Sequence, residues 1–349
     1  MTPVPPREAQ SIVFPEFRRA TWEQRPLPPP DQLQPTQVLV RAACSLINAG
    51  TELAIYTGSH MGFQTPGSTY PRMPYRPGWA FAGTVVSVGS AVTALQPGDR
   101  VAGSARVTDW AVVNADGGRL TPLPPGVSFE QGCLALQSVV GLHGVRLAGI
   151  RLGERVAVFG QGLIGQFARQ LAGIDGAAVV MAIDPLDSRL DVAGRHGATH
   201  TINPARDDTL AAIMAATSGQ GVDVAIEATG HPSVINDALK AAALLGRVIL
   251  LGSPRGRIEL DPYSDIHRKG VSVIGAHSTL AAAVPNAYHR WTEPEHHRLA
   301  VELIRQGRLR TDGLITHRIP AGDALGIFDA LAERPQDHLG VVVEWTPPV

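Results

Sequence analysis

Three glycines near the middle of the chain have the spacing of a phosphate-binding turn. In "VAVFGQGLIGQFARQLAG" they form a G-x-G-x-x-G pattern, directly after an apolar run and at the start of a helical pattern. Gly160 permits a tight turn, Gly162 lets the backbone approach a pyrophosphate, and Gly165 allows close packing of helix and strand. The N–H groups of the turn, including those of Leu163 and Ile164, would bind the anion with help from the helix dipole. The pattern therefore predicts a dinucleotide site.

An acidic side chain follows where a ribose would lie. The next strand-like run ends in "VVMAIDP", and its Asp184 can accept hydrogen bonds from both ribose hydroxyls. A 2′-phosphate would be repelled by this carboxylate, although Arg189 could partly offset the repulsion. We therefore expect NAD(H) in preference to NADP(H). The alternative interpretation is a glycine turn of an α/β protein that holds no ligand.

Two later strand-like runs end in small residues. "EATG" contributes Thr229 and Gly230, and "LLGSP" contributes Gly252 and Ser253. Ligands of open parallel sheets bind outside the carboxyl ends of the strands, so these residues are predicted to contact the adenosine or the nicotinamide. For Ser253, a simple turn residue is the alternative.

A parallel sheet is needed to bring these strand ends together, and the pattern predicts one. From Glu154 onward, strand-like and helix-like segments alternate over about 125 residues, as in doubly wound α/β folds. The expected strands are 155–160, 177–184, 199–203, 223–230, 246–252 and 270–277, and the expected helices are 163–174, 188–197, 207–219 and 232–245.

The parts before and after this region have a different character. Residues 1–35 are proline-rich and indicate an extended entry segment, and 37–103 show short apolar runs cut by glycine, which predict β-strands. The tail has two helical patterns and a final strand, "HLGVVVEW". We predict a β-rich catalytic domain from 1–132 and 281–349 and a dinucleotide-binding domain at 133–280.

Composition excludes several classes of protein. The net charge is −1 in 349 residues, with no strongly basic half, so no nucleic-acid partner is expected. The apolar runs are too short to cross a membrane, and the first 20 residues lack the apolar stretch of a secretory signal. Only two cysteines occur, Cys44 and Cys133, which rules out a disulfide framework. We expect a cytoplasmic protein.

The order of these parts resembles the medium-chain dehydrogenase/reductase superfamily. "PGWAFAGTVVSVGSAV" and "LQPGDRVAG" precede "IRLGERVAVFGQGLIG", and the likeness covers nearly the whole chain. It implies a GroES-like β-rich catalytic domain followed by a Rossmann doubly wound parallel-sheet cofactor domain. The segment "INAGTE" and the later "PGW" are similar to the zinc-lacking branch that includes bacteriochlorophyllide dehydrogenase, which has a comparable G-T-E and P-G-Y.

The resemblance also indicates whether this chain would bind a catalytic zinc ion. Zinc members of the superfamily take a Cys from C-G-[ST]-D, a His from G-H-E and a third ligand near the domain junction, and a catalytic zinc needs three ligands. The matching places hold Ala49 in the first motif and Trp79 with Ala80 in the second, and the third falls on Ala135 or Leu136. None of these side chains binds zinc, so we expect no catalytic metal.

Other possible ligands are scattered. Cys44 is out of frame and is expected to pack as a small buried hydrophobe. His60, His143 and His277 could build a different metal site, but isolated histidines more often have structural roles.

The proton of the reaction then needs a protein group. In zinc relatives the hydroxyl residue of C-G-[ST]-D passes this proton, and the resemblance puts Thr51 there. The histidine that often ends the relay would fall at Ala54 and is missing. Glu52, Tyr56 and His60 are the nearby candidates to replace it, although Glu52 could equally anchor the loop through hydrogen bonds.

Aromatic and polar side chains suggest the substrate. Tyr56 and Trp79 could form the walls of a substrate pocket, with core packing as the alternative. "RMPYRPGW" and "YSDIHRKG" add polar and basic groups, which favour a sugar, polyol or acidic substrate unless they are solvated loops.

The sequence thus favours a zinc-independent NAD(H)-dependent oxidoreductase that interconverts a hydroxyl and a keto group on a polar small molecule, such as a sugar or cyclitol. An NAD(P)H-dependent enoyl or quinone reductase and a non-catalytic dinucleotide-binding protein are the alternatives. By resemblance, the chain is expected to form a homodimer or homotetramer, because "VIGAH" matches a strand at the subunit edge.

Overall fold

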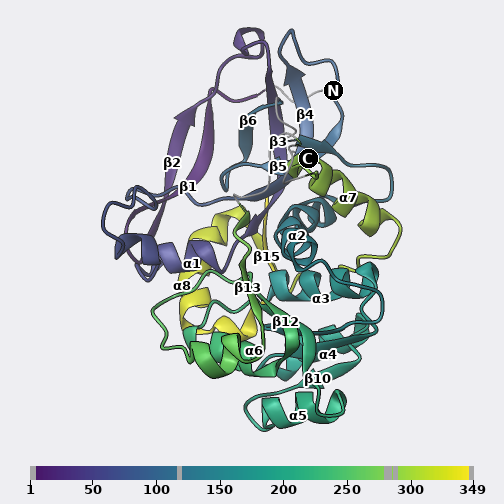
Figure 1. Cartoon of the computed structure of the whole chain (residues 1–349). Coiled ribbons are helices and arrows are strands. Elements are labelled where there is room, and N and C mark those ends of the chain that lie inside the picture. Colours follow the sequence, from purple (N-terminus) through teal and green to yellow (C-terminus); the bar gives the residue numbers. More distant parts are fainter. Residues whose placement is uncertain (1–4, 116–119, 279–284, 286–289, 346–349) are drawn as a thin grey trace.

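Two β-sheets with helices between and around them organise the chain (Figure 1). The computed structural model describes residues 5–115, 120–278, 285 and 290–345. In Figure 1 the mainly antiparallel sheet occupies the upper half and the parallel sheet the lower half.

The lower sheet has six strands, all parallel, in the order β10-β9-β8-β11-β12-β13. They are β8 (Arg155–Phe159), β9 (Val179–Ile183), β10 (His200–Ile202), β11 (Val222–Glu227), β12 (Ala242–Leu250) and β13 (Ser272–Gly275). In chain order this is 3-2-1-4-5-6, the dinucleotide-binding order. The predicted Rossmann fold is confirmed, and its order reverses between β8 and β11, where such folds bind ligands.

Four helices connect these strands: α3 (Leu163–Asp175), α4 (Asp187–Arg195), α5 (Thr209–Ala216) and α6 (Pro232–Ala241). The predicted last helix ran to residue 245, but α6 ends at Ala241. Ala242 instead pairs with Val222, so β12 begins there, and the apolar Leu244 and Leu245 are exposed. Strand pairing overrides helix propensity at this point.

The upper sheet has the order β14-β15-β3-β4-β5-β7, with β6 also paired to β3. Its strands are β3 (Gln37–Ile47), β4 (Ala80–Val88), β5 (Arg100–Ser104), β6 (Trp110–Asn114), β7 (Leu120–Pro122), β14 (His317–Pro320) and β15 (Val341–Glu344). Because β15 pairs antiparallel with β3, the tail returns to the first sheet. The strands of this sheet all lie within 1–132 and 281–349.

The entry segment is more ordered than expected. β1 (Glu8–Glu16) and β2 (Arg19–Pro26) form an antiparallel hairpin that is separate from the two larger sheets. Ile12 and Phe14 are fully buried in it. The prediction of an extended entry segment did not specify this hairpin, whose apolar residues pack against the first domain.

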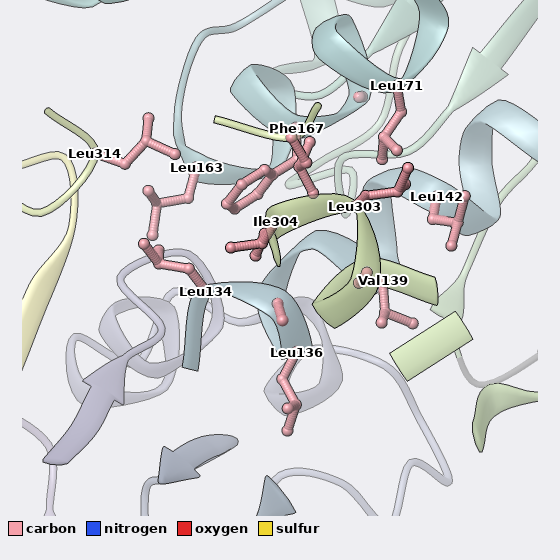
Figure 2. Packing of buried hydrophobic residues seen from close by; sticks show 14 of the residues in the cluster. Leu134, Leu136, Val139, Leu142, Leu163, Phe167, Leu171, Leu303, Ile304 and Leu314 are labelled. Atoms are coloured by element: carbon pink, nitrogen blue, oxygen red, sulfur yellow. The ribbon is translucent and has the colours of Figure 1, made fainter. Parts of the chain in front are cut away.

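Three of the other described helices are α1 (Thr51–Tyr56), α7 (Glu293–Arg305) and α8 (Ile327–Glu333). The 20-residue α2 (Phe129–Ala148) crosses from one domain to the other. It begins with a capping box from Ser128 and Gln131 and ends at Gly149 in the left-handed conformation. Figure 2 shows apolar side chains of α2, α3 and α7 meeting in one core, while Leu136 points away toward the first domain.

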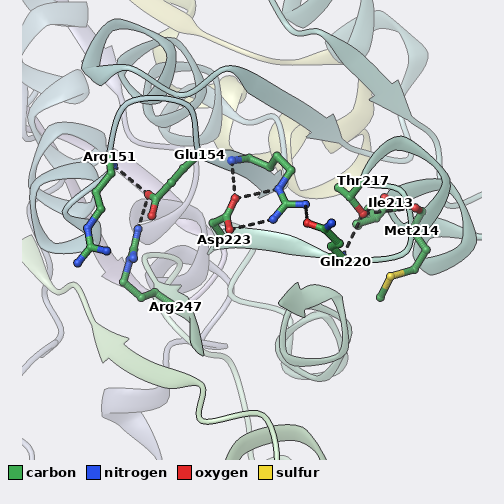
Figure 3. A network of polar contacts seen from close by, with 10 residues as sticks. Arg151, Glu154, Ile213, Met214, Thr217, Gln220, Asp223 and Arg247 are labelled. Atoms are coloured by element: carbon green, nitrogen blue, oxygen red, sulfur yellow. Dashed lines mark hydrogen bonds and ion pairs between the residues drawn. The ribbon is translucent and has the colours of Figure 1, made fainter. Parts of the chain in front are cut away.

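Ion pairs join neighbouring strands of the parallel sheet near the amino ends of β8 and β11. The Arg155 guanidinium donates to both oxygens of Asp223, and Arg247 pairs with Glu154 (Figure 3). Glu154, Arg155 and Asp223 lie at or next to the amino ends of β8 and β11, and Arg247 lies in the part of β12 that pairs with the start of β11. The carboxyl ends of the strands are therefore left for the candidate site.

Candidate active site at the domain junction

The glycine turn has the geometry that a phosphate group needs. Gly160 has a φ of +89°, and a Cβ on Gly165 would lie 1.8 Å from the Gly160 carbonyl oxygen. A Cβ on Gly162 would meet nothing within 4 Å. Gly162 is the N-cap of α3 and makes no side-chain cap, so the first N–H groups of the helix remain for an anion. The side chain of Leu163 is buried in the core with α2 and so contributes to this turn only through its backbone.

Asp184 lies directly after β9 and is 3 % exposed. One carboxylate oxygen accepts from the Gln161 N–H at 2.7 Å and the other from the Leu186 N–H at 2.9 Å. Since each carboxylate oxygen has two lone-pair sites, the group retains acceptor capacity for ribose hydroxyls. It holds the glycine turn and the end of β9 together.

Arg189 lies beside this carboxylate, with Nη1 at 3.6 Å from the Asp184 Oδ2. Its Nη2 donates to the carbonyl oxygens of Pro335 and His338. The guanidinium therefore links the two domains. This engagement reduces its capacity to compensate a 2′-phosphate.

The segments that follow β11 and β12 pack closely against each other. A Cβ on Gly230 would lie 2.2 Å from the Ser253 carbonyl oxygen, and one on Gly252 would lie 2.3 Å from the Gly230 nitrogen. A Cβ on Gly160 would lie 2.7 Å from the Thr229 Cγ2. The glycine turn and both later loops thus lie against one another, at the strand ends where the sequence predicts contacts with the cofactor.

Glu227, which the sequence reasoning missed, organises the loop after β11. It is fully buried and accepts from the Thr229 N–H, the Thr229 hydroxyl and the Gly230 N–H. Burial raises the pKa of this carboxyl, and the hydrogen bonds from Thr229 and Gly230 partly counter the rise. A carboxylate at the end of a buried strand, two residues before a threonine, was the available signal.

The cofactor loops contact the catalytic domain directly. Arg255, just after Ser253, donates from Nη2 to the Gly50 carbonyl oxygen at 3.1 Å. Gly50 is the N-cap of α1, whose first residue is Thr51. The structure therefore brings the loop after β12 next to the predicted catalytic segment, although the two are about 200 residues apart in sequence.

Glu52 is 2 % exposed, and both of its oxygens accept from backbone N–H groups. The donors are Asn48 at 3.2 Å and Gly78 at 2.9 Å. Desolvation raises the pKa of this carboxyl to about 8. The geometry is that of an anchor, which joins the Thr51 loop to the residue just before Trp79.

His60 is half-buried, and its Nδ1 accepts from the Gly62 N–H at 3.0 Å. Burial, with a smaller effect of the Arg255 charge, lowers the pKa of the imidazole. The ring is therefore neutral near pH 7 with its proton on Nε2. It caps the short helix Met61–Phe63 and could accept a proton only after Nδ1 releases Gly62.

Tyr56 does not line a pocket, which corrects its assignment to the substrate. It is 1 % exposed, its ring packs against Phe14 and Phe328, and its hydroxyl donates to Asp329 at 2.7 Å. Because of its position on the helix α1, this side chain points toward the core of the first domain.

Two basic residues considered for substrate binding have structural partners. Arg76 makes a two-pronged ion pair with Glu23 of the hairpin, with both N–O distances at 2.6 Å. Lys269 donates from Nζ to the carbonyl oxygens of Leu239 and Lys240.

The three positions that would hold a zinc ion do not fit it. Ala49 carries no ligand atom, nor does Ala135 or Leu136 at the third position, and the Trp79 indole N–H is a donor only. The two cysteines face each other with their sulfurs 3.6 Å apart. Within the described residues, no three His, Cys, Asp or Glu side chains gather as a metal site would require.

No helix in the described part of the chain is long and apolar enough to cross a membrane.

Comparison with known proteins adds the family. The model of the alcohol dehydrogenase GroES-like domain matches residues 34–114, and that of the zinc-binding dehydrogenase matches 164–293. The chain is 32 % identical over 236 residues to a D-guloside 3-dehydrogenase of Escherichia coli, covering 67 % of each chain. It is 30 % identical over 329 residues to an L-threonine 3-dehydrogenase of Bacillus licheniformis, covering 86 % of this chain and 89 % of that one.

The fold is also found in solved structures. The 2R,3R-butanediol dehydrogenase from Bacillus subtilis superimposes with a TM-score of 0.80 at 23 % identity, over 97 % of this chain and 100 % of that one. This likeness supports the two-domain architecture.

Two glycines of the turn make a matched pair for testing the phosphate site. Gly165→Ala should abolish NADH binding and lower stability, because its methyl group would overlap the Gly160 carbonyl. Gly162→Ala should leave the melting temperature nearly unchanged, because it meets open space, but should weaken NADH binding by obstructing the pyrophosphate. Thermal unfolding and fluorescence titration with NADH measure both effects. Equal NADH affinity in wild type and Gly162→Ala would place the pyrophosphate elsewhere.

The raised pKa of Glu52 predicts a pH-dependent stability. Because the folded-state pKa of about 8 exceeds the ordinary value of 4.5, this group stabilises the fold fully at low pH. The contribution falls between about pH 5 and 8, by at most about 1.4 kcal/mol per pH unit. Glu52→Gln should flatten the pH dependence of the unfolding free energy, measured with urea. The exposed Glu333→Gln is the control, and an unchanged slope in Glu52→Gln would contradict the assignment.

Proposed function

Since the chain belongs to the zinc-type medium-chain alcohol dehydrogenase family and is an NAD(P)-dependent dehydrogenase of hydroxyl groups, we propose that it works with NAD(H) and without zinc. Its substrate is proposed to be a polar small molecule, such as a sugar, polyol or cyclitol. The observation that carries this proposal is the Arg255–Gly50 contact, which sets the strand-end loops of the cofactor domain against Thr51.

The cofactor preference rests on Asp184. Its buried carboxylate lies between the glycine turn and the end of β9, where a 2′-phosphate would meet negative charge. The one nearby guanidinium that we considered as compensation, Arg189, is engaged by the C-terminal segment. The balance of charge favours the two ribose hydroxyls of NAD(H).

In the proposed reaction the cofactor handles the hydride and Thr51 handles the proton. When bound, the nicotinamide accepts or supplies the hydride. Thr51 hydrogen-bonds the reacting oxygen and passes its proton toward solvent or the ribose hydroxyls, because a threonine hydroxyl cannot hold a proton or a charge near neutral pH. Glu52 positions Thr51 through the backbone of its loop.

We propose zinc independence only from the residue types at the positions of the zinc ligands. The family model is named for zinc, yet the alignment puts Ala49, Trp79 and either Ala135 or Leu136 at the places of the ligands. The relatives above lend no support to a particular likeness with bacteriochlorophyllide dehydrogenase. Without a metal, hydrogen-bond donors must polarise the carbonyl oxygen.

The relatives guide the choice of substrate. The names of the two curated relatives are those of dehydrogenases of a guloside and of threonine, and the solved structure is that of a butanediol dehydrogenase. Each name denotes a hydroxylated polar molecule. We therefore place this chain's substrate in the same chemical class.

A homodimer or homotetramer is proposed from the edge of the parallel sheet. β13 is the terminal strand, and its Val273 is 42 % exposed. An unpaired apolar edge strand is a place where a second copy can add its own sheet.

Metal and cofactor content give the first test. Purified protein should contain no stoichiometric zinc by elemental analysis, and chelation should not change its activity. NADH should bind roughly tenfold more tightly than NADPH, or better. One zinc per chain would refute the metal-free proposal. Tighter binding of NADPH would refute the argument from Asp184 and favour a reductase of enoyl or quinone substrates.

Substitution of Thr51 tests the proton path. Thr51→Val should lower kcat for polyol oxidation by roughly 10²-fold, since general acid–base groups contribute on this scale. NADH affinity should be unchanged. Thr51→Ser keeps the hydroxyl and should retain most activity, which separates chemistry from packing. Equal rates for Thr51→Val and wild type would exclude Thr51 from proton transfer.

A further inference from the structure

Two buried polar groups at the domain junction have no partner among the described residues. They are the Trp79 indole N–H and the side-chain oxygen of Gln137, which is 3 % exposed. Unpaired polar groups are rare in protein interiors, because burial removes their hydrogen bonds to water. One group is a donor and the other an acceptor. A ligand with both kinds of group would satisfy them together.

The place of Gln137 follows from the neighbours of α2. Cys133 lies with its sulfur 3.6 Å from the Cys44 sulfur of β3, in the first domain. A Cβ on Gly144 would lie 2.9 Å from the Leu251 side chain, at the end of β12. On a helix, Gln137 and Gly144 are rotated only about 40° and 20° from Cys133. Gln137 is therefore on the α2 face that looks toward both domains, between their strand ends.

The place of Trp79 follows from the loops on either side of it. The preceding residue, Gly78, donates to Glu52, which also holds the Thr51 loop. The following residue, Ala80, pairs with Leu46 of β3, and the Cys133 side chain reaches the Leu46 backbone. The Trp79 side chain packs against the core cluster that contains this part of α2. Trp79 thus lies between the Thr51 loop and the face of α2 that carries Gln137.

We propose that Trp79 and Gln137 together bind a substrate with two adjacent oxygens, a vicinal diol in one direction and an α-hydroxyketone in the other. This proposal rests on the proposed function. The Trp79 N–H donates to the reacting oxygen, the task that a metal performs in zinc relatives. The Gln137 side-chain oxygen accepts from the neighbouring hydroxyl.

The atoms balance within the dehydrogenase reaction. The substrate C–H bond breaks and its electron pair leaves as hydride to the nicotinamide. The hydroxyl proton passes to Thr51, which releases its own proton toward solvent or the ribose. The C=O bond forms, and its oxygen keeps the hydrogen bond from Trp79. The hydroxyl bound by Gln137 does not react and serves recognition.

The test compares two variants on two matched ketones, one with an α-hydroxyl and one without it. Gln137→Leu removes the acceptor, with Gln137→Met as the second choice if the first variant unfolds. Trp79→Phe removes the N–H and keeps an aromatic ring. The controls are Gln306→Leu on the exposed end of α7 and Trp291→Phe at the surface. Thermal unfolding and NADH titration check that each variant is folded.

Gln137→Leu should lower kcat/KM for the hydroxyketone by roughly tenfold or more and leave that for the simple ketone within about threefold. Trp79→Phe should lower kcat for both ketones by roughly 10²-fold. The control variants should match the wild type. The proposal is overturned if Gln137→Leu affects both ketones equally, or if neither variant changes any rate.

A binding measurement separates this proposal from the proposed function. Calorimetry of the NAD⁺ complex, which cannot reduce the hydroxyketone, should show that this ketone binds to wild type and that its binding is weakened in both variants. If the wild type turned over no alcohol or ketone, the proposed function would fail, yet this measurement would still decide whether the pair binds the ligand. Equal affinity in wild type and variants, or no binding at all, would overturn the proposal that Trp79 and Gln137 bind the substrate.

Discussion

Buried carboxyl groups that accept hydrogen bonds from backbone N–H groups hold each loop of the candidate site. Asp184 binds the glycine turn and the end of β9, Glu227 closes the loop after β11, and Glu52 joins the Thr51 loop to Gly78. A buried carboxyl destabilises a fold unless its oxygens are satisfied, so each of these groups fixes the backbone around it. The candidate site therefore consists mainly of backbone segments whose positions are fixed by buried carboxyl groups. Side chains directed at a ligand contribute less.

A second constraint is the contact between domains. α2 packs on the first sheet through its Cys133 end and meets β12 near Gly144, and Arg255 and Arg189 add hydrogen bonds across the junction. These contacts set how far the cofactor loops lie from Thr51. Glycines at closely packed backbone positions allow the approach, because a Cβ would overlap the facing chain.

The same junction explains how a metal could be dispensed with. The family frame brings three positions together for zinc, and we propose that this chain fills them with Ala49, Trp79 and either Ala135 or Leu136. In place of metal ligands the junction holds an indole N–H and an amide oxygen, both buried. A preorganised donor in a site closed to water can polarise an oxygen without the reorganisation that solvent requires.

The sequence by itself determined the Rossmann domain and its glycine turn, since strand–helix alternation and G-x-G-x-x-G spacing are local patterns. It also predicted that the zinc ligands are missing, because that prediction depends only on the residue types at the aligned positions. It did not determine the β1–β2 hairpin, the end of α6 at Ala241 or the burial of Tyr56, because tertiary packing overrides propensity there. Only the tertiary structure decided that Arg255 meets Gly50, since this contact joins segments about 200 residues apart in sequence and no local pattern indicates it.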